Sequence, residues 1–313
     1  MPVQVEEILG KLREHGYEAF AVGGCVRDAI LGRIPGDWDI TTSAHPEEVK
    51  QVFGHTIDTG LQHGTVTVMR DHIGYEITTY RIDGEYEDGR HPKEVVFTAE
   101  LREDLRRRDF TINAMAYSHE TGIVDIFGGA EDLAARRIRC VGDAGERFTE
   151  DALRILRAVR FSAQLGFSIE KKTWQALCEL APSLVHVSKE RVQVELTKTL
   201  LSDRPEFIWK TEAAGLAPYI SKTFPEVFAA WKKQKSCAKQ SLEEKVCSKD
   251  VPAADKDAIK TETVAQQGHM FVKHECETDM AGEISAAAAH LPAEKAPNAM
   301  GSYLMMNGLS NKY

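Results

Sequence analysis

The stretch that most constrains the fold of this chain begins with two glycines and ends with two carboxylates. Gly23 and Gly24 follow the apolar run 19–22, which predicts a strand, a glycine turn and then a short helix over residues 26–31. Such a unit brings backbone N–H groups and a helix N-terminus to one point, which suits a phosphate group. A plain tight turn is the more common meaning of an isolated Gly-Gly pair, so the pair alone leaves both interpretations open.

Asp37 and Asp39 stand two residues apart around a second predicted strand, residues 38–42. A period of two puts both carboxylates on one face, while Trp38 and Ile40 face the core. Crowded carboxylates repel each other unless a cation neutralises them, and Mg²⁺ is usually bound by one or two carboxylates together with substrate phosphates. The pair therefore indicates a metal-dependent phosphoryl or nucleotidyl transfer site.

Composition narrows the class of protein. The chain has 313 residues, enough for two or more domains, and 42% of them are apolar and 28% charged. No apolar run is long enough to span a membrane, no secretory signal is visible, and the six cysteines show no paired spacing. We therefore expect a cytoplasmic protein with reduced thiols, no zinc site and no membrane partner. The net charge of −9 argues against indiscriminate nucleic-acid binding, although local clusters of arginine can still bind phosphate.

Two alternating β-branched segments, residues 65–69 and 75–81, predict a hairpin. Glu76 lies in its second strand and is either a solvent-facing carboxylate or a third carboxylate of the metal site. The polar, glycine-rich segment 81–92 predicts a loop, which is either functional or a solvated spacer.

A second polar cluster occupies residues 107–114. Arg108 is suited to pair with a phosphate in a bidentate manner. If this segment is helical, Asp109 and Asn113 share one face at i and i+4 and could bind a ribose hydroxyl. The alternative is a solvated helix start with an internal Arg–Asp pair.

From Thr149 the pattern becomes helical, with Thr149 as the expected cap. Four charged side chains step every three residues along this helix: Asp151, Arg154, Arg157 and Arg160. One face would therefore offer a carboxylate beside several guanidiniums, which can match the donor–acceptor edge of a base and a triphosphate beyond it. Ordinary ion pairing on an exposed helix is the alternative. Further helices are expected over residues 173–180, 188–201 and 206–214.

Four motifs, in this order, resemble the class II tRNA nucleotidyltransferases (CCA-adding enzymes) and bacterial poly(A) polymerases of the DNA polymerase β-like superfamily. They are Gly-Gly-Cys-Val-Arg-Asp at 23–28, Asp-Trp-Asp-Ile-Thr-Thr at 37–42, Arg-Arg-Asp-Phe-Thr-Ile-Asn-Ala at 107–114 and Glu-Asp-Ala-Leu-Arg at 150–154. The resemblance covers roughly residues 1–220, and the agreement of four separate motifs makes it specific.

The resemblance implies that Asp37 and Asp39 hold Mg²⁺ and take part in catalysis, with Glu76 as a candidate third carboxylate. Gly24 and Arg27 would contact the phosphates of the incoming nucleotide.

Further roles follow from the same resemblance. Arg108 would bind the nucleotide near its ribose and phosphates, with Asp109 and Asn113 supporting ribose recognition. Asp151 and Arg154 would hydrogen-bond the Watson–Crick edge of CTP or ATP. Two more arginines would support that helix or reach the triphosphate: Arg157 and Arg160.

The implied fold is an α/β head of the polymerase β-like nucleotidyltransferase type, a mixed sheet flanked by helices, over residues 1–130. An all-α neck would follow over 131–225, then a shortened or diverged helical C-terminal part of low order over 226–313. The implied function is Mg²⁺-dependent addition of CCA to the 3′ end of tRNA from CTP and ATP, with release of pyrophosphate. The loop 81–92 argues against the C-adding subgroup. The alternatives are addition of A only, poly(A) synthesis, or a catalytically silent RNA-binding relative.

Overall fold

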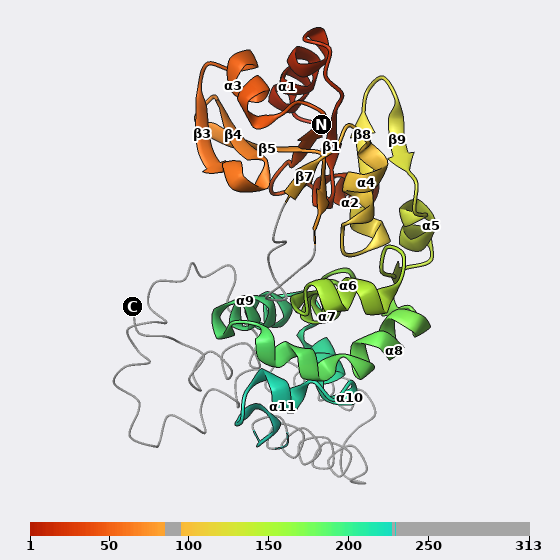
Figure 1. Ribbon diagram of the computed structural model, residues 1–313. Coiled ribbons are helices and arrows are strands. Elements are labelled where there is room, and N and C mark those ends of the chain that lie inside the picture. The colour runs from red at the N-terminus through yellow and green to blue at the C-terminus, as the bar shows by residue number, and fades with distance from the viewer. Residues whose placement is uncertain (85–94, 227–228, 230–313) are drawn as a thin grey trace, which may run out of the picture. The chain divides into compact units, whose positions relative to one another are not determined.

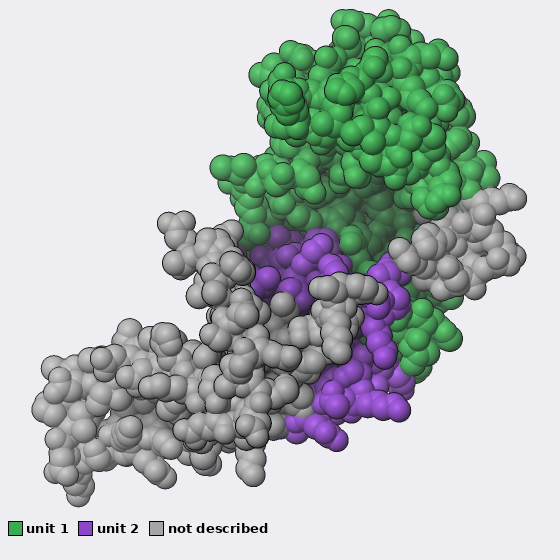
Figure 2. Space-filling model, turned by 90° about the vertical axis from the view of Figure 1, so that its left-hand side faces the viewer, with its two compact units in different colours: residues 1–158, 167–187 green, residues 159–166, 188–313 purple. Residues whose placement is uncertain are grey.

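The computed structural model describes residues 1–84, 95–226 and 229, and these form two compact units, shown in green and purple in Figure 2. Unit 1 comprises residues 1–158 and 167–187. Unit 2 comprises residues 159–166 and the described residues from 188 onward. The predicted domain divisions at 130 and 225 remain predictions. Most of the predicted loop 81–92 and nearly all of the C-terminal part from 226 lie outside the described residues.

Unit 1 is built on a seven-stranded sheet in the order β3-β4-β5-β2-β1-β8-β9 (Figure 1). Strands β2 and β5 run parallel and the other neighbours run antiparallel, so the predicted mixed sheet is confirmed. The strands are β1 Ala19–Val22, β2 Ile40–Thr42, β3 Thr56–Gly60, β4 Thr65–Arg70, β5 Ile73–Thr79, β8 Met115–Ser118 and β9 Gly122–Asp125. The predicted hairpin is the pair β4 and β5.

Helices flank this sheet, as the sequence predicts. Those that lie wholly in unit 1 are α1 Val3–Glu14, α2 Gly24–Ile30, α3 Pro46–Val52, α4 Leu101–Arg106, α5 Gly129–Ala134, α6 Ala144–Glu150 and α8 Lys171–Glu179. Helix α7, Leu153–Leu165, runs from unit 1 into unit 2. Two small strand pairs complete unit 1: β6 Arg81–Asp83 with β7 Val95–Phe97, and β10 Arg137–Ile138 with β11 Ser168–Ile169.

Strand β1 shows why the centre of the sheet is buried on both faces. All four of its residues are buried, and Phe20 and Val22 pack in one cluster with Leu105 of α4. Because side chains alternate along a strand, Ala19 and Ala21 face the opposite side, and α1 packs against β1. The apolar stripe of α1 is buried: Val5, Ile8, Leu9 and Leu12.

Two local predictions are corrected. Strand β2 begins at Ile40, so Asp37 and Asp39 precede the strand, and Trp38 is only half-buried. The predicted loop 81–92 begins as a strand, because Arg81–Asp83 pair with β7.

The predicted helix through 107–114 is absent. Helix α4 ends at Arg106, and only the 3₁₀ turn η2, Thr111–Asn113, follows. Backbone pairing with residues 139–140 replaces the helix. The N–H of Thr111 donates to the carbonyl of Arg139, and Phe110 forms an antiparallel bridge with Cys140. Tertiary pairing has thus overridden the local helical pattern.

The predicted helix from Thr149 is also interrupted. Helix α6 is capped by Asp143, whose side chain accepts from the backbone N–H of Glu146, and it ends at Glu150. Asp151 has an extended backbone between α6 and α7. Asp151 and Arg154 therefore do not share the face of one continuous helix.

Unit 2 is helical where it is described. It contains the end of α7, α9 Lys189–Leu200, the 3₁₀ turn η4 Pro205–Ile208, α10 Trp209–Ala213 and α11 Ala217–Ile220. In α9, Val192, Leu196 and Leu200 are buried, whereas Val194 is 49% exposed. At about 100° per residue, Val194 lies on nearly the opposite side of the helix from Val192.

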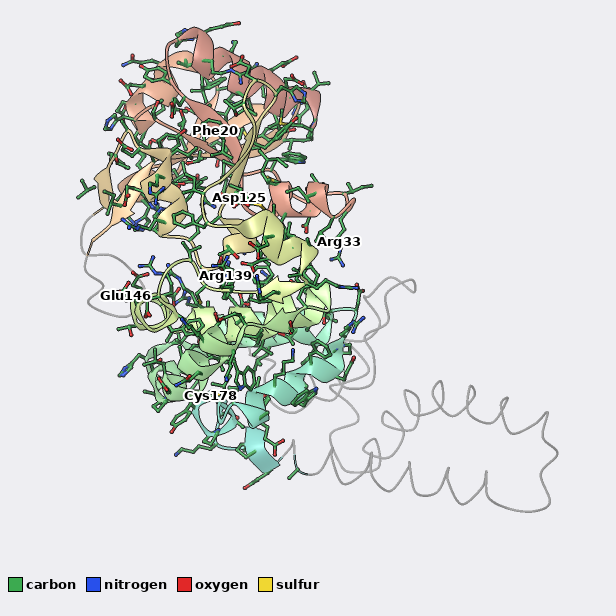
Figure 3. The ribbon with its side chains drawn as sticks, turned by 90° about the vertical axis from the view of Figure 1, so that its right-hand side faces the viewer. Phe20, Arg33, Asp125, Arg139, Glu146 and Cys178 are labelled. Atoms are coloured by element: carbon green, nitrogen blue, oxygen red, sulfur yellow. The ribbon has the colours of Figure 1, made fainter. Side chains whose placement is uncertain are left out.

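Helix α5 packs tightly against η2. A Cβ at Gly129 would lie 2.3 Å from the carbonyl oxygen of Thr111, so only glycine fits at the start of this helix. The side chain of Asp125 accepts hydrogen bonds from the N–H groups of Gly129 and Ala130. Figure 3 labels Asp125 and Arg139 beside this helix, and Arg139 donates to the carbonyl of Phe127. The position of η2 is therefore fixed from one side by α5.

The contrast between two glycines tests this packing. We expect Gly129→Ala to lower the free energy of unfolding by more than about 2 kcal/mol, because the methyl group meets backbone and cannot be accommodated. Gly10→Ala is the matched control, since it lies within α1 with no atom close to the added Cβ. It should raise the stability by up to about 1 kcal/mol. Urea denaturation measures both, and an unchanged midpoint for Gly129→Ala would contradict the packing.

Candidate active site

The predicted glycine turn lies between β1 and α2. Gly23 has φ of 84°, in the left-handed region that favours glycine, and α2 begins at Gly24. A Cβ at Gly23 would lie 3.1 Å from Nη1 of Arg108. The turn thus requires glycine both for its backbone angle and for the close approach of this guanidinium.

Asp37 and Asp39 lie in the segment that leads into β2, and both are exposed. The carbonyl of Asp39 accepts a hydrogen bond of 3.0 Å from the N–H of Val22, which holds Asp39 beside the end of β1. Glu76 is exposed on β5, the parallel neighbour of β2. The start of β2 and the glycine turn therefore meet at the same end of β1.

The pKa of the Asp39 carboxyl is raised above its ordinary value. The largest cause is loss of hydration among the surrounding protein atoms, although the residue keeps accessible surface. The charge of Asp37 also raises this pKa, the Arg108 guanidinium lowers it, and the charge of Glu76 adds a smaller increase. Negative charge is thus concentrated around Asp39 and only partly compensated, a setting that a bound cation would stabilise.

The donor set fits a magnesium ion that arrives with a nucleotide. Among the residues that the structure describes, no three His, Cys, Asp or Glu side chains converge on one metal position. A closed protein cage is therefore not formed there. Two carboxylates suffice for Mg²⁺, which commonly keeps waters and takes its remaining ligands from substrate phosphates.

A chain of hydrogen bonds joins four of the predicted site residues. Arg27 Nη1 donates to Asn113 Oδ1 at 2.6 Å, and Asn113 Nδ2 donates to Asp109 Oδ1 at 3.1 Å. Arg157 Nε donates to Asp109 Oδ2 at 2.8 Å. The structure thus brings together α2, the η2 segment and α7. Asp109 and Asn113 were expected on one face of a helix; the structure instead bonds their side chains to each other, with Asn113 in a 3₁₀ turn.

Asp109 is a buried, ionised carboxylate. Burial alone would raise its pKa, but the Arg157 guanidinium and the Asn113 amide hold the pKa at about 2. The backbone N–H of Phe110 donates a further bond of 2.8 Å to Oδ1. Because both carboxylate oxygens already accept hydrogen bonds, Asp109 is well placed to orient Asn113 and Arg157.

Arg108 is held by Asp104, a residue of α4. Its Nη2 donates to Oδ2 of Asp104 at 3.1 Å, and Asp104 also accepts two bonds from Arg107. These guanidiniums outweigh the effect of burial and lower the pKa of Asp104.

Asp151 and Arg154 lie at the junction of α6 and α7. Oδ1 of Asp151 accepts the backbone N–H of Leu153 at 3.0 Å, which caps the start of α7. Arg154 is buried; its Nη1 donates to Glu150 at 2.6 Å and its Nη2 to the carbonyl of Arg107 at 3.0 Å. The structure thus holds this guanidinium by several acceptors.

Arg160 lies in the part of α7 that belongs to unit 2. It is buried there, and its Nε donates to Glu195 of α9 at 2.5 Å. This bond fits the predicted supporting role more closely than direct contact with a triphosphate.

The sequence analysis gave no site role to Asp104 or to Glu150. Each stands four residues before an arginine of the site, Arg108 and Arg154. Spacing of i and i+4 between an acid and a following arginine is a recognised signal for pairing on a helix. That signal was available but is too common to single these residues out.

Comparison with known proteins defines the class. Residues 19–139 match the family described as the poly(A) polymerase head domain, and residues 166–222 match the one described as the probable RNA and SrmB-binding site of polymerase A. Together with the mixed sheet and its flanking helices, these matches define a nucleotidyltransferase head followed by a helical segment.

Similar proteins are CCA-adding enzymes. That of Leuconostoc mesenteroides is 54% identical over 202 residues, which cover 64% of this chain and 50% of that enzyme. That of Geobacillus thermodenitrificans is 53% identical over 214 residues, 68% of this chain and 53% of that enzyme. The chain belongs to the family of tRNA nucleotidyltransferases and poly(A) polymerases, which confirms the resemblance of the four motifs. It spans about half the length of the curated relatives it matches.

Solved structures agree. A crystal structure of the Bacillus stearothermophilus CCA-adding enzyme in complex with CTP aligns with a TM-score of 0.65 and 45% identity, over 70% of this chain and 54% of that one. A tRNA nucleotidyltransferase complexed with a primer tRNA and an incoming ATP analogue aligns with a TM-score of 0.57 and 29% identity, over 72% of this chain and 67% of that one. In the described part of this chain, no helix has the length and apolar character needed to cross a bilayer.

The low pKa of Asp109 predicts how stability depends on pH. Its folded-state pKa of about 2 lies below the ordinary value of 3.8. Its contribution is therefore complete above about pH 4 and is lost as the pH falls through 2. We expect Asp109→Asn to cost about 2 to 3 kcal/mol at pH 7, since each pKa unit corresponds to about 1.4 kcal/mol.

Urea denaturation of both proteins between pH 7 and pH 2 measures this difference, which should shrink toward zero at the acid end. Asp58→Asn, which removes an exposed partner of Lys50, is the control and should change the stability little at any pH. A difference that stays constant down to pH 2 would show that Asp109 is not held ionised by its neighbours.

Proposed function

We propose that this chain is a template-independent RNA nucleotidyltransferase that adds CCA to the 3′ end of tRNA from CTP and ATP and releases pyrophosphate. The observation that carries the proposal is the Asp37–Asp39 pair next to the glycine turn. The Arg108 guanidinium, which lies against Gly23, partly offsets the rise in the pKa of Asp39. Support comes from the CCA-adding relatives and from the relative solved with CTP. The cytoplasmic location expected from the sequence remains a prediction.

Asp37 and Asp39 would hold Mg²⁺, and Glu76 remains a candidate third carboxylate. When bound, the cation would lower the pKa of the attacking hydroxyl and stabilise the leaving oxygen. The carboxylates would place the RNA 3′-hydroxyl in line with the α-phosphorus of the nucleotide, and pyrophosphate would leave on the opposite side.

Binding of the nucleotide would fall to the residues around this pair. Gly24 and Arg27 would contact phosphates at the start of α2, and Arg108 would reach the phosphates and ribose. Asn113 would meet the ribose, with Asp109 orienting it through the bond between their side chains.

Asp151 and Arg154 would recognise the base edge. Arg157 would act at second hand, since it is bonded to Asp109, and Arg160 would brace the helix through Glu195. Arginine is suited to such recognition because its fixed fork of donors matches planar acceptors.

The direct test supplies tRNAs that end at the discriminator base, at C and at CC, each with labelled CTP, ATP or both in Mg²⁺. With both nucleotides present, we expect all three tRNA ends to be extended to products that stop at CCA. Addition to the CC end alone would indicate A addition, and long ladders with ATP would indicate poly(A) synthesis. Binding of tRNA by the wild type with no turnover would favour a silent relative.

The carboxylate pair has its own test in the same assay. Asp39→Asn should lower the rate of nucleotide addition at least about a thousandfold without loss of folding, whereas Asp71→Asn, at the exposed hairpin turn, should leave that rate unchanged.

Base selection has its own test. We expect Asp151→Ala and Arg154→Ala to reduce the preference for CTP and ATP over UTP and GTP at least about tenfold, because they would remove the acceptor and the donors that the proposal assigns to recognition of the base edge. The measurement is kcat/KM for each of the four nucleotides on the appropriate tRNA end. Arg106→Ala is the control, since that arginine is exposed and paired only with Glu103 among the described side chains. An equal loss for all four nucleotides would contradict the assignment.

A further inference from the structure

Asp104, a residue of α4, is completely buried, and none of the roles proposed above is assigned to it. Its Oδ1 accepts bonds of 3.1 and 2.8 Å from Nε and Nη2 of Arg107. Its Oδ2 accepts bonds of 3.1 Å from Nη2 of Arg108 and from Oγ1 of Thr41, whose single proton is shared with the carbonyl of Thr78 at 3.2 Å. A carboxylate without access to water is tolerated only when its neighbours satisfy it, and here four donors do so. Asp104 is therefore fixed in one place.

Arg108 depends on this carboxylate. Within the part of the chain that the structure describes, Asp104 is the only side chain that accepts a hydrogen bond from Arg108, and Nε of Arg108 is buried without a partner. The same guanidinium lies against Gly23 and acts on the charge of Asp39. One hydrogen bond thus orients an arginine that lies against the glycine turn.

Thr41 connects the same point to the strand that follows the carboxylates. It lies on β2, two residues after Asp39, and is completely buried. Because Thr41 and Arg108 share one oxygen of Asp104, the orientation of the guanidinium is tied to the position of β2.

We propose that Asp104 is a positioning residue, which holds the Arg108 guanidinium beside the glycine turn in the orientation that receives the incoming nucleoside triphosphate. This inference rests on the proposed function, because it takes a nucleotide as the ligand of Arg108. Pre-orientation matters because a long flexible side chain otherwise loses conformational freedom at the moment of binding.

The alternative is that Asp104 only stabilises α4 through Arg107. The two oxygens of the carboxylate separate these roles. Arg107→Met disturbs the partners of Oδ1 and leaves the bond from Oδ2 to Arg108 in place. It is therefore the matched control for the loss of a buried ion pair in the same helix.

The experiment measures binding of CTP with Mg²⁺ to the full chain in the absence of RNA, by calorimetric titration, together with thermal unfolding of each variant. We expect Asp104→Asn to weaken CTP binding about tenfold to a hundredfold, as for a misplaced charged hydrogen bond. Arg107→Met should change the affinity less than about threefold. In an Arg108→Met background, Asp104→Asn should cause no further loss of affinity, because the residue acts through Arg108.

Thr41→Val provides a second route if Asp104→Asn does not fold. It removes the other donor to Oδ2 while leaving every charge in place, and it should weaken CTP binding about twofold to fivefold only when Arg108 is present. The inference is overturned if the double variant Asp104→Asn/Arg108→Met loses affinity by the product of the two single losses. It is also overturned if Asp104→Asn folds and binds CTP as the wild type does, or, where Asp104→Asn does not fold, if Thr41→Val does so. A wild-type chain that neither binds CTP nor extends tRNA would instead overturn the proposed function.

Discussion

The candidate site depends on the hydrogen bonds and the ion pair that the buried carboxylate of Asp109 makes with its neighbours. This carboxylate is ionised inside the protein, and it accepts from Asn113, Arg157 and the N–H of Phe110. Through Asn113 it reaches Arg27 of α2. Segments far apart in the sequence are therefore held by one charge, and breaking such a buried pair leaves the other charge uncompensated, which is costly.

The same arrangement recurs around the site. Asp104 accepts from two arginines and a threonine, and so does Asp132, which accepts from Arg137, Arg139 and Thr111. Both carboxylates are completely buried. In the proposed function the site receives a highly charged nucleotide, and guanidiniums that are already oriented bind it at a lower cost in free energy. The buried aspartates hold the guanidiniums bonded to them in fixed orientations.

Particular residues show how far the sequence could lead. The glycine turn and the predicted hairpin appear where the pattern placed them, since φ above zero and strict alternation are local requirements. Asp109 and Asn113 were expected to share a helix face, but backbone pairing with residues 139–140 replaced the helix, and their side chains bond to each other instead. Asp151 was placed inside a helix, whereas it lies between two. Helical periodicity could not reveal a break whose side chain caps the next helix.

By itself the sequence determined the family, the strand–glycine turn–helix unit and the pairing of Asp37 with Asp39, because these depend on residue types at short spacing. Only the tertiary structure decided which arginines are held and by what. Arg108 is bound to Asp104 within its own segment, but Arg157 meets Asp109 across 48 positions and Arg27 meets Asn113 across 86. No local pattern encodes such pairs, since they form only when the packing of the sheet and its helices brings distant segments together and excludes water from them.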